Sequence, residues 1–196
     1  MKKTFIIIQI LLLSFILTAG NDISLMRYPD ISPDSNYVVF AYKGDIWKAL
    51  VSGGKAERLT DHFGNDTRPK FSPDGKFVAF SSDRNGNYDV FVISAEGGPA
   101  RQLTYRSSHD EVTGWTGDGS GVIFHSRRDL HFYYGNSGIF SIPVGGGMPQ
   151  LLMDQMGKNG SISADDKFIA FNINRIPDFR QRYRGPANND VWVYNR

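Results

Sequence analysis

Four copies of one short pattern recur along the chain, each combining a turn rich in small residues with an apolar triplet. The turns begin at residues 32, 72, 116 and 163, so the copies lie 40, 44 and 47 residues apart. The turns read Ser32-Pro33-Asp34, Ser72-Pro73-Asp74-Gly75, Thr116-Gly117-Asp118-Gly119 and Ser163-Ala164-Asp165-Asp166. The triplets read Val38-Val39-Phe40, Val78-Ala79-Phe80, Val122-Ile123-Phe124 and Ile169-Ala170-Phe171. A period of about 40–45 residues with several short strands is typical of β-propeller blades.

The second copy shows how one unit is expected to fold. Its proline presets the first turn torsion, its aspartate bonds the backbone, and its glycine accepts a positive φ. A strand over 76–81 leads into a hairpin over 82–87, where Asn-Gly is a strong hairpin signal. Strands over 88–93 and 100–104 follow. The unit therefore predicts a four-stranded antiparallel meander, and stacking such sheets radially covers their faces.

The repeats predict an all-β propeller over 21–196, with units near 25–68, 69–112, 113–159 and 160–196. Strong apolar runs in the triplets indicate strands covered on both faces. The last unit reaches Asp190-Val191-Trp192 and ends at Arg196 without the glycine turn and closing strand of the others. We therefore expect about four blades, the last of them incomplete.

The first 20 residues have the pattern of a secretory signal peptide. Lys2 and Lys3 precede an apolar run from Phe5 to Leu17, and Thr18-Ala19-Gly20 offers small residues for cleavage. The run is too short for a spanning helix, which needs about 20 residues. We expect an exported protein, in the periplasm, with no stable membrane span after cleavage.

Charge and cysteine content exclude several classes of function. Removing Lys2 and Lys3 with the leader leaves 20 basic residues against 20 acidic ones, so the mature chain is formally neutral. No basic stripe with interleaved aromatic residues is present, which argues against nucleic acid as a partner. The chain has no cysteine, so disulfides and thiolate metal sites are excluded.

The stretch 72–84, which reads Ser-Pro-Asp-Gly-Lys-Phe-Val-Ala-Phe-Ser-Ser-Asp-Arg, resembles the repeat of TolB-like and tricorn-like β-propellers. TolB, tricorn-type proteases, prolyl-oligopeptidase-like enzymes and some amidohydrolases share this repeat, so it implies the fold and leaves the function open. Arg182-Tyr183-Arg184-Gly185, followed by Asp190-Val191-Trp192-Val193, resembles more specifically an element late in the first propeller of tricorn-type proteases. Pro186 departs from that family, which more often has a second glycine there.

The tricorn-type resemblance implies a longer protein than this chain. Those enzymes carry two propellers, a PDZ-like module and a carboxy-terminal serine protease domain that holds the nucleophile. The resemblance implies six blades in the complete first propeller, so we expect this chain to be a fragment. It also implies contacts with downstream domains of the same polypeptide and assembly into homo-oligomers.

The chain offers little chemistry of its own. It has no Gly-x-Ser-x-Gly elbow, and its four histidines, His62, His109, His125 and His131, lack a metal-ligand spacing. His109-Asp110-Glu111 is interpreted as a polar loop joining two blades. The recurring aspartates Asp34, Asp74, Asp118 and Asp165 indicate turn structure, and 83–87 is interpreted as a hairpin rather than a calcium loop. We therefore expect no catalytic residue, no metal site and no cofactor in this chain.

One local concentration of arginines stands out, at Arg175, Arg180, Arg182 and Arg184 in the long hairpin 172–189. Arginine forks bind carboxylates, so Arg182, Tyr183 and Arg184 are the candidate contacts for a peptide or a neighbouring domain. The alternative is a structural hairpin whose arginines pair with Asp178 and Asp190.

Three functions fit these observations. The first is the non-catalytic amino-terminal propeller portion of an exported tricorn-like serine peptidase, which gates or guides peptides to a downstream protease domain. The second is a TolB-like periplasmic scaffold that binds partner proteins. The third is the propeller of another hydrolase, such as an amidohydrolase, which a downstream His-x-His signature would favour. Peptides or protein partners are the expected ligands in each case.

Overall fold

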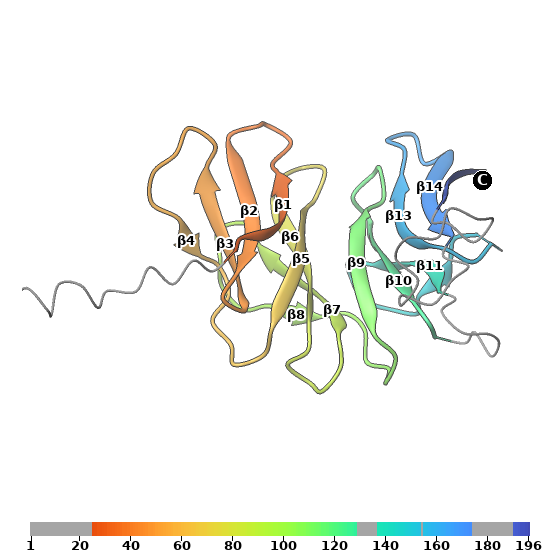
Figure 1. Ribbon diagram of the computed structural model, residues 1–196, viewed down its shortest axis with the longest axis horizontal. Coiled ribbons are helices and arrows are strands. Elements are labelled where there is room, and N and C mark those ends of the chain that lie inside the picture. The colour runs from red at the N-terminus through yellow and green to blue at the C-terminus, as the bar shows by residue number, and fades with distance from the viewer. Residues whose placement is uncertain (1–24, 129–136, 154, 174–189) are drawn as a thin grey trace, which may run out of the picture.

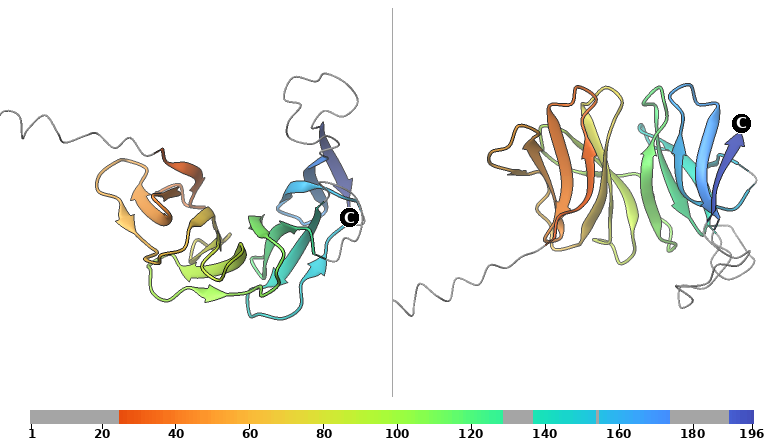
Figure 2. Two further views of the ribbon diagram at one scale, coloured as in Figure 1. Left: turned by 60° about the horizontal axis from the view of Figure 1, so that its bottom comes forward. Right: turned by 45° about the horizontal axis from the view of Figure 1, so that its top comes forward.

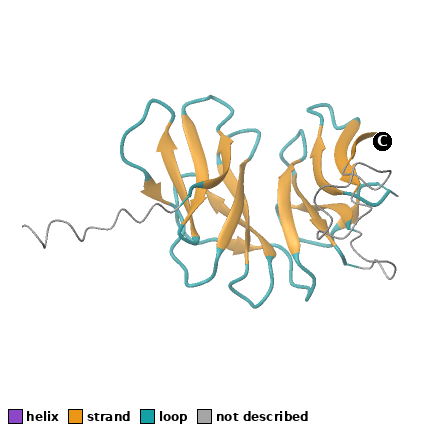
Figure 3. Ribbon diagram, in the orientation of Figure 1, coloured by secondary structure: helices purple, strands orange, loops and turns teal. Residues whose placement is uncertain are grey.

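The structure is a computed structural model that describes residues 25–128, 137–153, 155–173 and 190–196. In these ranges the chain consists of strands and loops (Figure 3). No helix there is long and apolar enough to cross a membrane. The expected leader, residues 1–20, lies outside the described part of the chain.

The strands form four antiparallel sheets in sequence order. The first sheet contains β1 (Arg27–Ile31), β2 (Tyr37–Tyr42), β3 (Asp45–Leu50) and β4 (Glu57–Arg58). The second contains β5 (Asp66–Phe71), β6 (Phe77–Ser82), β7 (Asp89–Ser94) and β8 (Arg101–Gln102). The third contains β9 (Asp110–Trp115), β10 (Gly121–Ser126), β11 (Gly138–Pro143) and β12 (Gln150–Leu151). The fourth contains β13 (Lys158–Ile162), β14 (Phe168–Ile173) and β15 (Asp190–Asn195).

The four sheets follow one another along an arc, as blades do in a propeller (Figure 1 and Figure 2, left). The first strands β1, β5, β9 and β13 contact one another in turn along the inner side. The predicted all-β propeller of antiparallel meanders is therefore confirmed. Each of the second, third and fourth sheets begins two or three residues before the repeat unit read from the sequence, at Asp66, Asp110 and Lys158.

The recurring turn has the same hydrogen bonds in all four blades. In the second, the Ser72 hydroxyl donates to Asp74 Oδ1 over 2.6 Å, and the Lys76 and Phe77 amides donate to the Asp74 carboxylate and the Ser72 hydroxyl. These donors lower the pKa of the turn carboxylates Asp34, Asp74, Asp118 and Asp165. The interpretation of the recurring aspartates as turn residues is confirmed.

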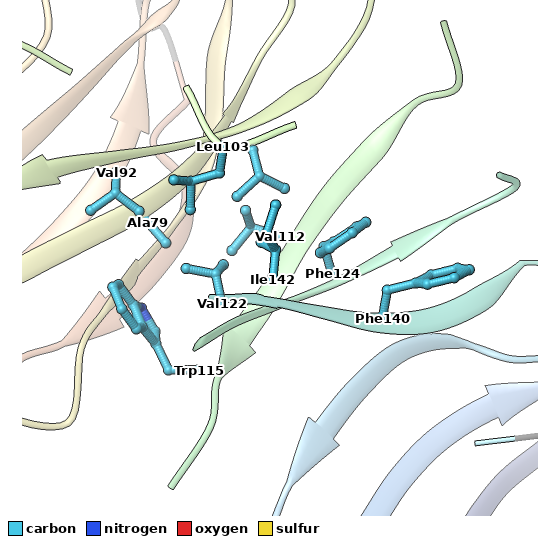
Figure 4. Close-up of a cluster of buried hydrophobic side chains, with 10 residues drawn as sticks. Ala79, Val92, Leu103, Val112, Trp115, Val122, Phe124, Phe140 and Ile142 are labelled. Carbon is cyan, nitrogen blue, oxygen red and sulfur yellow. The ribbon is translucent and has the colours of Figure 1, made fainter. Parts of the chain in front are cut away.

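The core lies between the sheets, in three apolar clusters. Figure 4 shows the middle cluster, where Ala79, Val92 and Leu103 of the second blade face Val112, Phe124 and other side chains of the third. Every residue of β10 is buried, as expected for a strand that is covered on both faces. Because the second and third sheets each contribute to two clusters and the outer sheets to one, a blade depends on its neighbours for stability.

Candidate functional site: the channel and the hairpin rim

One end of the propeller carries the hairpins between the second and third strands, at Lys43-Gly44 and 83–88, and the connections between sheets, at 59–65 and 103–109. We call this end the hairpin rim (lower edge in Figure 1). In the fourth blade, Ile173 pairs with Asp190 where β14 ends and β15 begins, so that hairpin starts and ends at the same rim. The predicted contact residues Arg182, Tyr183 and Arg184 belong to this hairpin, outside the described residues.

The first strands of the four blades line a hollow of about 420 Å³ on the inner side of the arc. Because all four inner strands contribute, the hollow is part of the central channel of the propeller. Its walls are mostly polar. Its lining consists of Tyr28, Pro29, Arg68, Lys70, Val112, Thr113, Asn159, Gly160 and Ser161.

A β-bulge in the inner strand of each described blade shapes this lining, at Thr113 in the third blade and in a common form in the other three. The strand register shifts between Arg27 and Asp30, between Thr67 and Lys70, and between Lys158 and Ser161. Inside these bulges Tyr28, Arg68 and Asn159 each have φ 53°, the left-handed region that side chains other than glycine rarely adopt. Bulges re-aim side chains, and here they place three large polar ones at the channel.

Arg68 is held between two neighbours in the channel. Its Nε donates to Glu111 Oε2 over 2.7 Å, and its guanidinium lies 5.0 Å from the centre of the Tyr28 ring. Lys70 pairs with Asp30 over 2.8 Å. Both cations of the hollow therefore have a carboxylate partner, and the channel wall is polar without a strong excess of charge.

A second hollow, of about 310 Å³, opens at the hairpin rim between the third and fourth blades. It shares β9 and β13 with the first hollow, and Arg68 reaches its wall through the pair with Glu111. The lining consists of Ser107, Ser108, His109, Glu111, His125, Ser126, Arg127, Ser137 and Lys158. The two hollows therefore follow one another along the same inner strands.

His125 is the most buried titratable group of the second hollow, with 7% of its surface exposed. Its Nε2 lies 3.8 Å from Glu111 Oε2, and its buried Nδ1 has no hydrogen-bond partner among the described residues. Burial lowers the pKa of His125 well below its usual value, and the cations Arg68, Lys158 and Arg127 add to this while Glu111 opposes it. The imidazole is therefore neutral at neutral pH.

The interpretation of His109-Asp110-Glu111 as a polar loop holds for His109, which lies in the connection between two blades, and is wrong for the other two residues. Asp110 and Glu111 are the first residues of β9. Asp110 is fully buried and paired with Arg128, and Glu111 faces the channel. The 44-residue spacing that matches Asp110 with Asp66, and Arg128 with Arg84, was the sequence signal for this strand, because Arg84 pairs with Asp66 in the same way.

The other candidates are placed as follows. Residues 83–87 form the expected hairpin, closed by the Gly86 amide donating to the Asp83 carbonyl over 2.8 Å. The ring centres of His62 and Phe63 lie 4.2 Å apart, with the rings tilted. His109 accepts a hydrogen bond from the Tyr88 amide. His131 lies outside the described residues. Within the described ranges, no three histidine, aspartate or glutamate side chains gather as a metal would require.

Comparison with known proteins adds the family. Residues 23–196 match the family model described as the tricorn protease N-terminal beta propeller domain. Tricorn protease homolog 1 of Streptomyces coelicolor is 30% identical over 171 residues, which are 86% of this chain and 16% of that protein. A Sulfurisphaera tokodaii protein described as a tricorn-like protease N-terminal subunit is 29% identical over 178 residues, 87% of this chain and 89% of its own length.

Solved structures show the same fold. The chain aligns with TolB from Acinetobacter baumannii at a TM-score of 0.68 and 24% identity, over 88% of this chain and 41% of that one. It aligns with the crystal structure of the tricorn protease at a TM-score of 0.60 and 17% identity, over 88% of this chain and 16% of that one. The chain thus spans about a sixth of the length of the tricorn protease and of its Streptomyces homologue. It belongs to the family of tricorn protease N-terminal β-propeller domains.

Proposed function

We propose that this chain is the non-catalytic amino-terminal propeller portion of an exported tricorn-like serine peptidase, and that its channel guides peptides to a downstream protease domain. The observation that carries the proposal is the polar channel lined by the inner strands of all four described blades. Membership of the tricorn N-terminal propeller family supports the link to a peptidase.

The chemistry of the channel suits a passing peptide. Thr113, Asn159 and Ser161 offer hydrogen bonds to backbone groups of any sequence. Arg68 and Lys70 are paired with carboxylates, so neither is a free charge that would trap an acidic peptide. A wall that binds weakly and without strong sequence preference allows transit rather than tight capture.

An uncovered apolar face supports a larger propeller. Val191 and Val193, which lie on the same face of β15, are 73% and 67% exposed. The equivalent residues of β7, Val90 and Val92, are at most 4% exposed because the third blade covers them. We propose that a further sheet of the complete protein covers β15, and that Arg182, Tyr183 and Arg184 contact a peptide or a neighbouring domain at the hairpin rim.

Export is part of the proposal and has a direct test. The charged start, short apolar run and small residues of positions 1–20 support a cleaved leader and a periplasmic location. Amino-terminal sequencing of the protein from a periplasmic extract should begin near residue 21. A chain that retains Met1 and sediments with membranes would contradict export as a soluble protein.

The peptide-guiding role is tested on the complete protein encoded by the gene. Ser161→Trp places a large ring at the channel wall and should lower the turnover of short peptides, while Lys76→Trp on the exposed turn should not. Labelling of the active-site serine with a small fluorophosphonate should be equal in both variants. Unchanged peptide turnover in Ser161→Trp, or a gene without a peptidase domain, would overturn the proposal.

A TolB-like scaffold is the alternative that the fold similarity supports. It predicts a complete propeller without a hydrolase domain, and stable binding to a protein of the cell envelope. The propeller of an amidohydrolase predicts a downstream metal-ligand signature instead. The gene sequence past the Arg196 codon separates all three. Gel filtration of the complete protein tests the homo-oligomer that the family resemblance implies.

A further inference from the structure

The joints between blades contain a buried carboxylate pair that the guiding function does not use. Asp45 and Asp89 begin the third strands of blades one and two, and Asp66 and Asp110 begin the first strands of the blades that follow. Backbone hydrogen bonds show that the two joints are equivalent. The Asp66 amide donates to the Gly44 carbonyl, and the Asp110 amide donates to the Tyr88 carbonyl, both over 2.7 Å. Each of the first two joints thus brings together one aspartate from either blade.

The third joint lacks both aspartates at once. The Gly157 amide donates to the Ser137 carbonyl over 2.7 Å, so Gly157 has the place of Asp110, and Gly138 has the place of Asp89. Two glycines replace two aspartates together. In the second joint the two carboxylates act on each other, because burial and, in addition, the charge of Asp110 raise the pKa of Asp89.

The two remaining joints differ in how their charge is balanced. In the first, Arg84 Nη2 donates to both oxygens of Asp66 over 2.9 Å, and Arg58 Nε lies 3.1 Å from Asp45 Oδ2. Each of these two carboxylates therefore has a guanidinium beside it, although Arg58 also pairs with the exposed Asp61. In the strand register Arg58 lies opposite Trp47.

The second joint has one guanidinium too few. Arg128 pairs with Asp110, but the residue opposite Phe91, in the place of Arg58, is Gln102. Its neutral amide donates to Asp89 Oδ2 over 3.0 Å, and the Thr104 hydroxyl donates to Oδ1 over 3.0 Å. Asp89 is 2% exposed and Asp110 is fully buried, so one negative charge is enclosed without a counter-charge.

An enclosed charge without a partner is unfavourable, and the group takes up a cation or neutralises. The part of the chain that the structure describes brings no third carboxylate or imidazole to the joint, which a divalent metal would need. Asp110 Oδ1 is buried and has no hydrogen-bond partner among the described residues, so it is a free acceptor beside Asp89. These features fit a proton as the missing cation.

We infer that the joint between the second and third blades is a proton-binding site, in which Asp89 takes up one proton under mildly acidic conditions and the joint becomes more stable. The charged groups that face Asp89 are Asp110 on β9, which favours the proton, and Arg128 beyond β10, which opposes it. Independently of this geometry, burial raises the pKa of Asp89 to about 6.

The sign of the effect follows from linkage. Asp89 binds its proton more readily in the folded chain than in the unfolded one, so stability rises as the pH falls through 6 and levels off near the ordinary aspartate pKa. Between pH 7 and pH 4.5 this group should raise the folding equilibrium constant about 25-fold. His125 acts in the opposite direction, because its pKa is lowered in the folded chain, so only differences between variants isolate Asp89.

Three variants of the full chain test the site. Asp89→Asn mimics the protonated form, so its folding constant should lack the gain of about 25-fold between pH 7 and pH 4.5. Gln102→Arg copies the first joint and should reduce the gain without removing it, because burial keeps the pKa of Asp45 raised even beside Arg58. Arg58→Gln copies the second joint and should add a gain of the same sign at Asp45. Urea unfolding at each pH provides the folding constants.

Carbon-13 NMR of the Asp89 carboxyl group reports the proton itself and does not depend on any variant folding. A titration midpoint near 6, insensitive to the choice of sodium, potassium or choline chloride, is expected. A midpoint near the ordinary value of an aspartate, or a pH profile of Asp89→Asn that is parallel to wild type, would overturn the inference. A midpoint that falls in sodium or potassium but not in choline would assign the site to a metal cation instead.

Discussion

The exposed face of β15 provides the sharpest test of the proposed larger propeller, because the chain contains its own control. Val191 is the second residue of β15 and is 73% exposed, whereas its equivalents Val90 and Ile139 are fully buried. Val191 and Val90 are the same residue type at the same position of a blade, and they differ in whether a further sheet covers them. Val191→Ala and Val90→Ala therefore remove the same two carbon atoms from the same place in two blades.

The expected magnitudes follow from burial. Removing two buried carbons lowers stability by about 1.6 kcal/mol through lost transfer free energy, and the remaining cavity brings the loss for Val90→Ala to about 2 kcal/mol. An exposed side chain changes stability by at most about 0.5 kcal/mol, so Val191→Ala should be nearly neutral in this chain. In a complete protein whose next sheet covers β15, Val191→Ala should lose about as much as Val90→Ala.

Urea unfolding followed by tryptophan fluorescence measures both variants in the 196-residue chain and in the complete protein. A loss above about 1.5 kcal/mol for Val191→Ala in the short chain would mean that β15 is already covered in solution, which analytical ultracentrifugation would detect as self-association. A neutral Val191→Ala in the complete protein would refute the reasoning that a further blade packs there.

Two further substitutions test a contact between blades and a buried ion pair within one blade. Gly117→Ala would place Cβ only 2.2 Å from the Ala164 carbonyl oxygen of the next blade, so the free energy of unfolding in urea should fall by about 1–3 kcal/mol. Gly145→Ala is the control, because its Cβ meets nothing within 4 Å and its stability should be unchanged. Equal stability of the two variants would contradict the close approach at Gly117. Arg84→Ala leaves the carboxylate of Asp66 buried without its partner and should lose about 3–5 kcal/mol, and a loss below about 1 kcal/mol would show that water reaches the joint.

The repeats allowed the fold to be predicted because each blade combines local signals that agree. The turn hydrogen bonds of Ser72 and Asp74 involve residues two to five apart, and the hairpin over 83–87 is closed within itself. Such contacts depend on neighbouring residues alone, so the sequence shows them directly. The family resemblance then added the number of blades expected in the complete ring.

The inner strands could not be predicted in the same way. Arg68 and Pro69 lie in the bulge of β5, and a proline in a strand together with a broken alternation reads as a boundary rather than as a strand. The burial of the Asp110 carboxylate depends on its ion pair with Arg128, which is 18 residues away in the same blade. Burial of a charged strand end is therefore set by a tertiary partner that periodicity does not reveal.

The channel became visible only in the structure. The contact role expected from the sequence for Arg182, Tyr183 and Arg184 stays a prediction. The hollow of the channel is lined by segments from 28 to 161, spread over four repeat units. No short motif marks it, because each blade contributes two or three residues of different chemistry. The only shared signal is the bulge, and three residues with φ 53° at equivalent positions require coordinates to be seen.

The joints show two solutions to one packing problem. Between the third and fourth blades, a Cβ on Gly157 would lie 2.3 Å from the Phe171 ring, and Met153 packs with Ile139 and Phe171. Glycines and apolar contact there take the place of the two carboxylates of the other joints, and buried ion pairs are no more stabilising than well-packed apolar groups of similar volume. Replacing the polar joint therefore need not weaken the propeller, but it removes the titrating carboxylate. Acid should then stabilise the second joint without stabilising the third, so hydrogen exchange between pH 7 and pH 5 should slow at the Asp110 amide relative to the Gly157 amide after correction for intrinsic rates.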